Sequence, residues 1–147
     1  EASPDTVDAH WYDIIWGPTD LDIIGAHGTL IGTGARNTSN IISVLNREGY
    51  NSTCAAKKCD GLDCGASGDW YLPSRDELFE MHDELYSKGI GGFRDGRYWS
   101  STQDRGSKDR ARCILFDPGD NGGACELDMK DSSYYVRPIR HFSLPEY

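Results

Sequence analysis

Residues 69–78 read Asp-Trp-Tyr-Leu-Pro-Ser-Arg-Asp-Glu-Leu, and this stretch predicts an extended segment followed at once by a helix. Ser74 and Glu77 have the spacing of a capping box, in which the hydroxyl and the carboxylate each accept a hydrogen bond from an otherwise unpaired backbone N–H. A helix is therefore predicted to begin directly after Ser74. Pro73 disfavours helical geometry in the residue before it, so residues 70–72 are predicted to be extended, with their side chains in the core.

The helix that follows has apolar residues at helical spacing. Leu78, Met81 and Leu85 fall on one face, which is typical of an amphipathic helix packed on a core. Gly89 is predicted to end this helix, because glycine adopts the left-handed conformation of a C-terminal cap without strain.

An earlier helix is predicted between Asn37 or Thr38, either of which can serve as its N-cap, and Gly49. A short further piece of helix is predicted within residues 55–62. Runs of β-branched and aromatic residues predict strands or extended segments elsewhere. These runs are residues 10–16, 21–24, 98–102, 112–116, 124–128 and 134–140.

Helices followed by a closing set of strands predict an α+β fold with two main helices and an antiparallel sheet. A chain of 147 residues is most simply one domain. The polar residues 1–9 are predicted to form a flexible N-terminal segment, with residues 10–147 as the single domain.

The charge and hydropathy of the chain exclude two broad functions. A net charge of −9 argues against nucleic-acid binding and against general affinity for anionic membranes. No apolar run approaches the roughly 20 residues of a membrane-spanning helix, so no membrane insertion is expected.

The charge is unevenly distributed, because residues 94–112 hold six basic residues against three acids, a local charge of +3. One interpretation is a solvated hairpin with local ion pairs. The other is a basic face for an anionic ligand. The six basic residues are Arg94, Arg97, Arg105, Lys108, Arg110 and Arg112.

Five cysteines in a domain of this size favour an oxidising compartment, and so an extracellular or cell-surface protein. Cys113 and Cys125 flank a turn-rich loop and are predicted to form a disulfide across a hairpin. Cys54 with Cys64, or Cys59 with Cys64, is the second candidate pair, and spacing does not decide between them. Zinc is disfavoured at these three positions because they lack a Cys-x2-Cys pair and a nearby histidine.

No catalytic constellation is visible. The four histidines are scattered, and no serine lies in a glycine-flanked elbow, so the chain is predicted not to be an enzyme and to need neither a cofactor nor a metal. Calcium is the alternative, since one hairpin carries several oxygen ligands. These residues, which turn formation also explains, are Asp117, Asp120, Asn121 and Asp128.

Several separated motifs resemble one family. In order, they are Ile31-Gly32-Thr33-Gly34, residues 69–74 with Glu77-Leu78, Gly91-Gly92-Phe93, Tyr98-Trp99-Ser100-Ser101 and residues 134–140. This pattern is similar to the bacterial DUF1566 family, which includes the C-terminal domain of the Legionella collagen-like adhesin. The resemblance spans roughly residues 23–142. It implies a C-type-lectin-like fold and a role at the bacterial surface.

The resemblance also implies where a ligand would bind, because lectin-like folds present loops between their last strands. We expect a ligand face within residues 94–131 for adhesion to a glycan, sulfated or acidic such as a glycosaminoglycan, or to a host protein. A homotrimer is a further expectation. The predicted contact residues are Gln103, Asp104, Arg105, Lys108, Arg110, Arg112, Asp120, Asn121, Asp128 and Lys130.

Three alternatives stay open. One is a structural or oligomerisation tip of a surface fibre, and another is a variable binding protein diversified by a retroelement or carried by a phage. An enzyme of the formylglycine-generating type, which has a related architecture and uses active-site cysteines, is less favoured. Arg137 and Arg140 belong to the family motif and are predicted to be structural, paired with acids such as Asp69.

Overall fold

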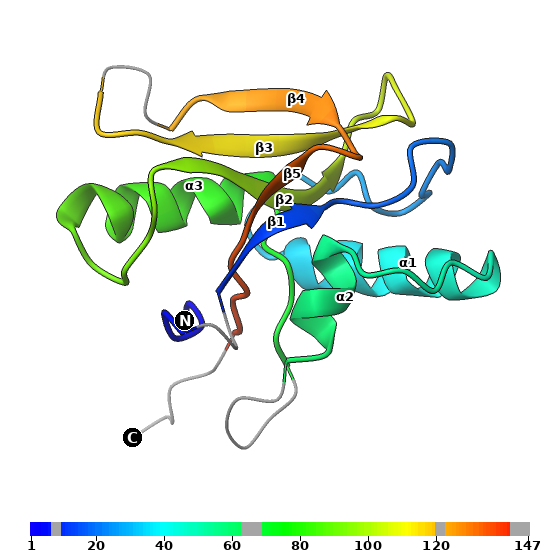
Figure 1. Ribbon diagram of the computed structural model, residues 1–147, viewed down its shortest axis with the longest axis horizontal. Helices are drawn as coiled ribbons and strands as arrows, with labels where there is room; N and C mark the ends of the chain where they lie inside the picture. The colour runs from blue at the N-terminus through cyan, green and yellow to red at the C-terminus, as the bar shows by residue number, and fades with distance from the viewer. Residues whose placement is uncertain (7–9, 63–68, 120–122, 142–147) are drawn as a thin grey trace.

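The structure is a computed structural model that describes residues 1–6, 10–62, 69–119 and 123–141. Within those residues it has three α-helices, one short 3₁₀ helix and five strands in one sheet (Figure 1). The helices are α1 (Gly34–Arg47), α2 (Ala55–Asp60), α3 (Arg75–Glu84) and the 3₁₀ turn η1 (Tyr86–Lys88). The strands are β1 (Trp11–Ile15), β2 (Gly96–Gln103), β3 (Arg110–Phe116), β4 (Cys125–Met129) and β5 (Ser133–Val136).

The sheet has the strand order β1-β5-β2-β3-β4 and lies between helices on both faces. Trp99 packs in one cluster with residues of α1 and α2, whereas its neighbour Tyr98 packs in another with Leu78 and Met81 of α3. Because successive strand residues point to opposite faces, α1 and α2 cover one face of the sheet and α3 covers the other.

The α+β class is confirmed, but the expected antiparallel sheet is wrong in one pair. β5 runs parallel to β2, joined at Tyr98 and Tyr135, while the other neighbours are antiparallel. After β4, at one edge of the sheet, the chain returns and inserts β5 between β1 and β2. As a result β5 runs parallel to β2, whereas in a meander each strand is antiparallel to its neighbours. Among the predicted extended runs, residues 21–24 form no strand.

The helix predicted after Ser74 is confirmed with its capping box. Ser74 Oγ accepts from the Glu77 backbone N–H, and Glu77 Oε1 accepts from the Ser74 N–H at 3.0 Å. Gly89 has the predicted left-handed conformation with φ of 69°, but it ends η1 rather than α3, which stops at Glu84. Tyr71 lies in the extended segment before the helix and forms an isolated bridge with Ile139.

The predicted start of the first helix was wrong, because α1 begins at Gly34. Asn37 lies inside the helix, where its side chain donates to the Gly28 carbonyl at 2.7 Å and to Ser101 Oγ at 3.2 Å. Thr38 is also internal and accepts from the Leu72 N–H at 3.1 Å. Both polar side chains therefore connect α1 to other segments instead of capping it.

Glu77 joins the starts of two helices. Besides its own cap, Oε1 accepts from the Gly34 N–H at 2.9 Å, and Oε2 accepts from the Tyr71 hydroxyl at 3.0 Å. A side chain at Gly34 would place its Cβ 2.2 Å from Glu77 Oε1 and 2.8 Å from the Ser74 nitrogen. Only glycine at position 34 lets the start of α1 approach Glu77 and Ser74 this closely. The buried Glu77 carboxylate, near the positive end of each helix dipole, thus fixes α1 against α3.

Arg137 joins the two ends of the described chain rather than pairing with Asp69 as predicted. It is 2% exposed, and its guanidinium donates to the Ser3 carbonyl and to the Gly91 carbonyl. Ser3 in turn donates its N–H to the Pro138 carbonyl at 2.9 Å. Residues 1–3 lie along the segment after β5, where Ala2 forms an isolated bridge with Ile139, and the expected flexibility of residues 1–9 stays a prediction.

Arg140 has a different partner as well. Its Nε donates to Glu1 Oε2 at 2.7 Å, and its guanidinium lies 4.8 Å from the centre of the Trp70 ring. The prediction of a structural role is consistent with these contacts, although the acid is Glu1.

The predicted disulfide between Cys113 and Cys125 is wrong, and the strand register explains why. Cys113 lies opposite Glu126, whereas Cys125 lies opposite Ile114, so the two thiols project from opposite faces of the sheet. Cys54, Cys59, Cys113 and Cys125 are all free thiols. The two other candidate pairs, Cys54 with Cys64 and Cys59 with Cys64, both involve Cys64, which lies outside the described residues.

No helix in the described part of the chain combines the length and the apolar character that crossing a membrane requires.

Candidate functional site

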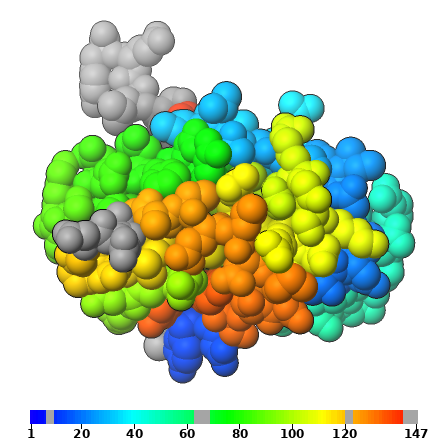
Figure 2. Space-filling view, turned by 90° about the horizontal axis from the view of Figure 1, so that it is seen from above, coloured from blue at the N-terminus to red at the C-terminus, as the bar shows by residue number. Residues whose placement is uncertain are grey.

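The basic residues of the predicted ligand face lie on and beside one loop. Arg105 and Lys108 belong to the connection between β2 and β3, and Arg110 and Arg112 follow on β3. The Asp104 N–H donates to the Arg110 carbonyl at 3.0 Å, which closes the loop at its base. The connection protrudes from the surface formed by β3 and β4 (Figure 2, yellow).

Three of these cations have no partner. Arg105, Lys108 and Arg110 are exposed, and none of their side chains makes a hydrogen bond or ion pair with another residue that the structure describes. Among the described residues, Arg36 is likewise exposed without an ion pair, whereas seven other basic side chains pair with acids. Those in ion pairs with acids are Arg47, Arg75, Lys88, Arg94, Arg97, Arg112 and Arg140.

Arg112 completes the group from a half-buried position. Its Nη2 lies 3.9 Å from Asp104 Oδ1, a loose ion pair, and it projects from the same face of β3 as Arg110. Leu127 lies opposite Arg112 on β4 and is 36% exposed. We call Arg105, Lys108, Arg110 and Arg112 the basic strip. It presents positive charge beside an exposed aliphatic side chain.

Two predicted contact residues, Gln103 and Lys130, are buried beneath the loop. Lys130 is 0% exposed, and its Nζ donates to the Leu21 carbonyl at 2.8 Å and to Gln103 Oε1 at 2.7 Å. Gln103 Oε1 also accepts from the Ile23 N–H at 2.9 Å. The pair therefore holds the irregular segment after β1 against the sheet, and its polar atoms are turned away from solvent.

Lys130 gives the protein a testable dependence on pH. Burial lowers its pKa from 10.5 to about 8, so the folded state binds fewer protons than the unfolded state between those values. At pH 7 the folded protein holds a charged ammonium group in a buried position, which lowers its free energy of unfolding. This free energy rises as the pH increases from about 8 towards 10.5. Relative to Lys130→Met, we expect the wild type to gain about 2–3 kcal/mol in free energy of unfolding between pH 7 and 10.

Urea denaturation of both proteins at each pH measures this difference, and shifts from tyrosine ionisation cancel in the comparison. A constant difference between wild type and Lys130→Met across that range would show that Lys130 titrates normally.

The remaining predicted contact residues do not join the basic strip. Asp128 lies opposite Ala111 and so projects from the face of the sheet opposite to Arg110 and Arg112. Asp104 is in the loop and pairs with Arg112, whereas Asp120 and Asn121 lie outside the described residues. Asp117, a candidate calcium ligand, accepts from the Gly119 N–H at 3.1 Å, as expected in a turn.

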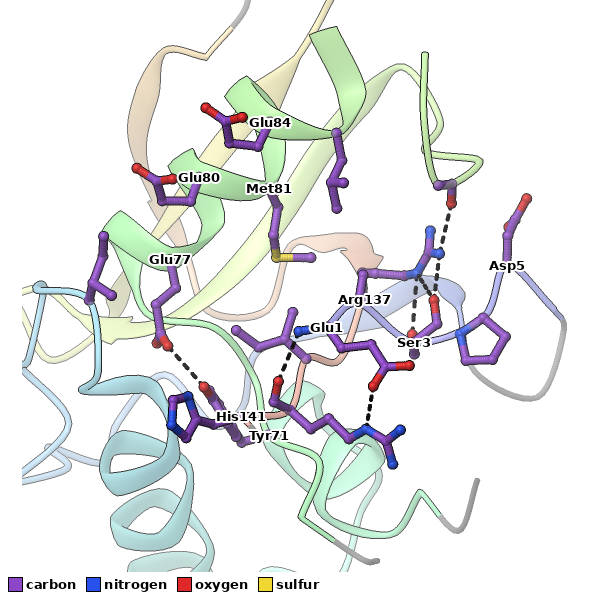
Figure 3. Close-up of a pocket in the computed structure, with 17 residues that line it drawn as sticks. Glu1, Ser3, Asp5, Tyr71, Glu77, Glu80, Met81, Glu84, Arg137 and His141 are labelled. Carbon is purple, nitrogen blue, oxygen red and sulfur yellow. Dashed lines mark hydrogen bonds and ion pairs between the residues drawn. The ribbon is translucent and has the colours of Figure 1, made fainter. Parts of the chain in front are cut away.

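A separate cavity of about 770 Å³ lies between α3, the N-terminal segment and the segment after β5 (Figure 3). Met81, Leu85, Ile31 and Ile139 provide apolar walls. Most polar groups at its edge already have partners within the protein. Glu77 caps two helices, Arg137 holds Ser3, and Arg140 pairs with Glu1.

The cavity nevertheless has an acidic rim on α3. The side chains of Glu80 and Glu84 project from α3 (Figure 3). The Glu80 side chain is exposed and makes no bond with a described residue, and Glu84 pairs with Lys88 at 2.6 Å. The cavity therefore suits an apolar or cationic ligand. The negative charge of its rim is opposite to the positive charge of the basic strip. The sequence did not predict this cavity, because its walls come from segments as distant as Ala2 and Ile139. The one signal in the sequence is the i, i+4 spacing of Glu80 and Glu84, which places both on one face of the predicted helix.

Comparisons of the chain with protein-family models, with curated proteins and with solved structures found no match.

Proposed function

We propose that this protein is a binding module that presents the basic strip to an anionic ligand, such as a sulfated or acidic glycan at a cell surface. The observation that supports the proposal most is that three exposed cations, whose side chains have no partner among the described residues, lie together on one loop and the start of the strand that follows it. The resemblance to the DUF1566 family supplies the expectation of a lectin-like fold, a bacterial surface location and a role in adhesion, which are parts of the same proposal.

The chemistry of the strip matches such a ligand. Arginine presents a planar fork of donors that pairs bidentately with sulfate or carboxylate, and Arg105, Arg110 and Arg112 provide three of these forks. A single exposed ion pair contributes only ~0–1 kcal/mol, so affinity requires several contacts made together. A repeating polyanion meets this requirement, because it offers charges at regular spacing to one protruding loop.

Three of the five thiols lack the environment of a reactive cysteine. Burial raises the pKa of the Cys54, Cys59 and Cys113 thiols, and each is fully buried. A reactive cysteine requires an accessible thiolate with a lowered pKa. An active site of the formylglycine-generating type would therefore have to use Cys125, which is half-buried, or Cys64, which lies outside the described residues.

The proposal predicts the outcome of a glycan-array and heparin-column screen. A triple variant, Arg105→Ala, Lys108→Ala and Arg110→Ala, is expected to elute from heparin at clearly lower salt than the wild type. The reason is that the variant protein lacks three cations that would contact the sulfate groups of heparin. The matched control is Arg36→Ala, Arg47→Ala and Lys88→Ala, which removes the same number of exposed cations from other surfaces. We expect the control to retain most of the wild-type retention.

Equal retention of the two triple variants would contradict the assignment to the strip, since net charge alone would then explain binding. Binding that is lost in EDTA would favour the calcium alternative. If no glycan binds, an oligomer with a large apolar interface would instead favour the structural tip, for which light scattering gives the readout.

A further inference from the structure

Three side chains with metal-binding atoms meet on one face of β3 and β4. Cys113 lies opposite Glu126, and Asp128 is two residues further along β4, so all three project from the same face. The Cys113 sulfur and one oxygen from each carboxylate lie within 4.8 Å of one another. This cluster lies on the opposite face of the sheet from the basic strip and is independent of the proposed function.

The two carboxylates are held in place by neighbours outside the cluster. Arg97 donates from Nε and Nη2 to the two oxygens of Glu126. The Tyr134 hydroxyl donates to Asp128 Oδ2, and the Arg97 guanidinium lies 5.9 Å from the centre of the Tyr134 ring. Each carboxylate oxygen has two lone pairs, so one donated hydrogen bond leaves room for a second interaction. Partners of this kind orient carboxylate ligands in known metal sites.

The charges of the cluster do not balance without a cation. Arg97 neutralises Glu126, but Asp128 has no basic partner within ion-pair distance among the described residues. In the metal-free protein the two carboxylates carry two negative charges against the single positive charge of Arg97, and loss of the Cys113 proton on metal binding adds a third. A divalent cation supplies the two positive charges needed to make the group neutral. Both carboxylates are partly exposed, whereas the Cys113 sulfur is buried behind them.

We propose that Cys113, Glu126 and Asp128 bind a divalent, thiophilic metal ion of the zinc type. A sulfur with two carboxylate oxygens provides three positions of a tetrahedron, and water can occupy the fourth. Calcium is less suited, because it requires six to eight oxygen ligands. Binding forms a metal–sulfur bond and releases the thiol proton to solvent.

Cadmium and zinc titrations of the metal-free protein test the proposal. Cadmium bound to a thiolate produces an ultraviolet charge-transfer absorption, which we expect in the wild type and in Cys125→Ser, whose thiol is on the other face. Zinc calorimetry in two buffers of different ionisation enthalpy is expected to show release of about one proton per ion. Asp128→Asn, whose amide oxygen can still accept from Tyr134, is expected to lower zinc affinity at least about tenfold.

Cys113→Ser is expected to abolish the cadmium absorption. The proposal is overturned if the wild type shows no absorption, or if the absorption persists in Cys113→Ser, which would assign it to Cys54, Cys59 or Cys64. Unchanged zinc affinity in Asp128→Asn, with folding verified by circular dichroism, would also overturn it.

Discussion

Glu77→Ala is expected to lower the free energy of unfolding by about 3–5 kcal/mol, a large part of the stability of a small domain. The substitution removes a buried carboxylate that accepts from the Gly34 and Ser74 N–H groups and from the Tyr71 hydroxyl. Alanine leaves the two buried N–H groups without an acceptor, and each such group costs about 1–3 kcal/mol. Urea denaturation followed by tryptophan fluorescence measures the change.

Two variants separate the hydrogen bonds of Glu77 from its charge and from helix propensity. Glu77→Gln keeps an oxygen for both N–H groups, so a smaller loss of about 1–2 kcal/mol is expected. Glu80→Ala changes an exposed residue one turn along the same helix face and is expected to cost less than about 0.5 kcal/mol. If Glu77→Ala were no more destabilising than Glu80→Ala, the joint between α1 and α3 would not depend on this carboxylate.

Arg137→Met is expected to cost about 3 kcal/mol and to release the N-terminal segment from the segment after β5. Arg137 is buried, and its pKa is lowered by burial, yet its donors hold the Ser3 and Gly91 carbonyls in place. Its guanidinium also lies 4.6 Å from the centre of the Phe93 ring. Methionine keeps most of the apolar contact but leaves those carbonyls unpaired. Denaturation reports the global loss, and amide exchange at Ser3 reports the local release.

Arg140→Met is the matched control for Arg137→Met. Arg140 lies three residues later and pairs with the partly exposed Glu1, so its removal is expected to cost about 1 kcal/mol or less. Similar losses in the two variants, or protection of the Ser3 amide in Arg137→Met, would show that the buried guanidinium does not fasten the segment.

Local rules predicted the parts of the fold that depend on neighbouring residues. The capping box of Ser74 and Glu77 and the extended segment before it follow from spacings of a few residues, and both are confirmed. The second bond of Glu77, to Gly34, was not predictable in this way. It joins residues 43 positions apart, and glycine at position 34 has many explanations in sequence alone.

The errors arose where register or chain direction decides the outcome. Cys113 and Cys125 do flank a hairpin, but a one-residue offset places the sulfurs on opposite faces. The same offset brings Cys113 beside Glu126 and Asp128, a grouping that sequence patterns did not indicate. The parallel placement of β5 likewise depends on where the returning chain inserts, and alternation of residue types carries no information about that choice.

The basic strip was predictable as a segment but not as a set of contact residues. A local excess of Arg and Lys is visible in the sequence, and turn signals place it on a hairpin. Burial of Gln103 and Lys130 was not visible, because it depends on the segment after β1 folding over the end of β2. The structure therefore narrows the proposed ligand contacts to residues whose charge faces solvent.

The most direct test of the proposed function is a calorimetric titration of a heparin oligosaccharide at low and high salt, with the strip variant and its matched control beside the wild type. Saturable binding that weakens with salt is expected for the wild type and the control, because exposed charges are screened as ionic strength rises. The strip variant is expected to show little binding at either salt concentration. Binding by the strip variant at wild-type affinity, or no saturable binding by the wild type at low salt, would contradict the proposal that this loop recognises an anionic glycan.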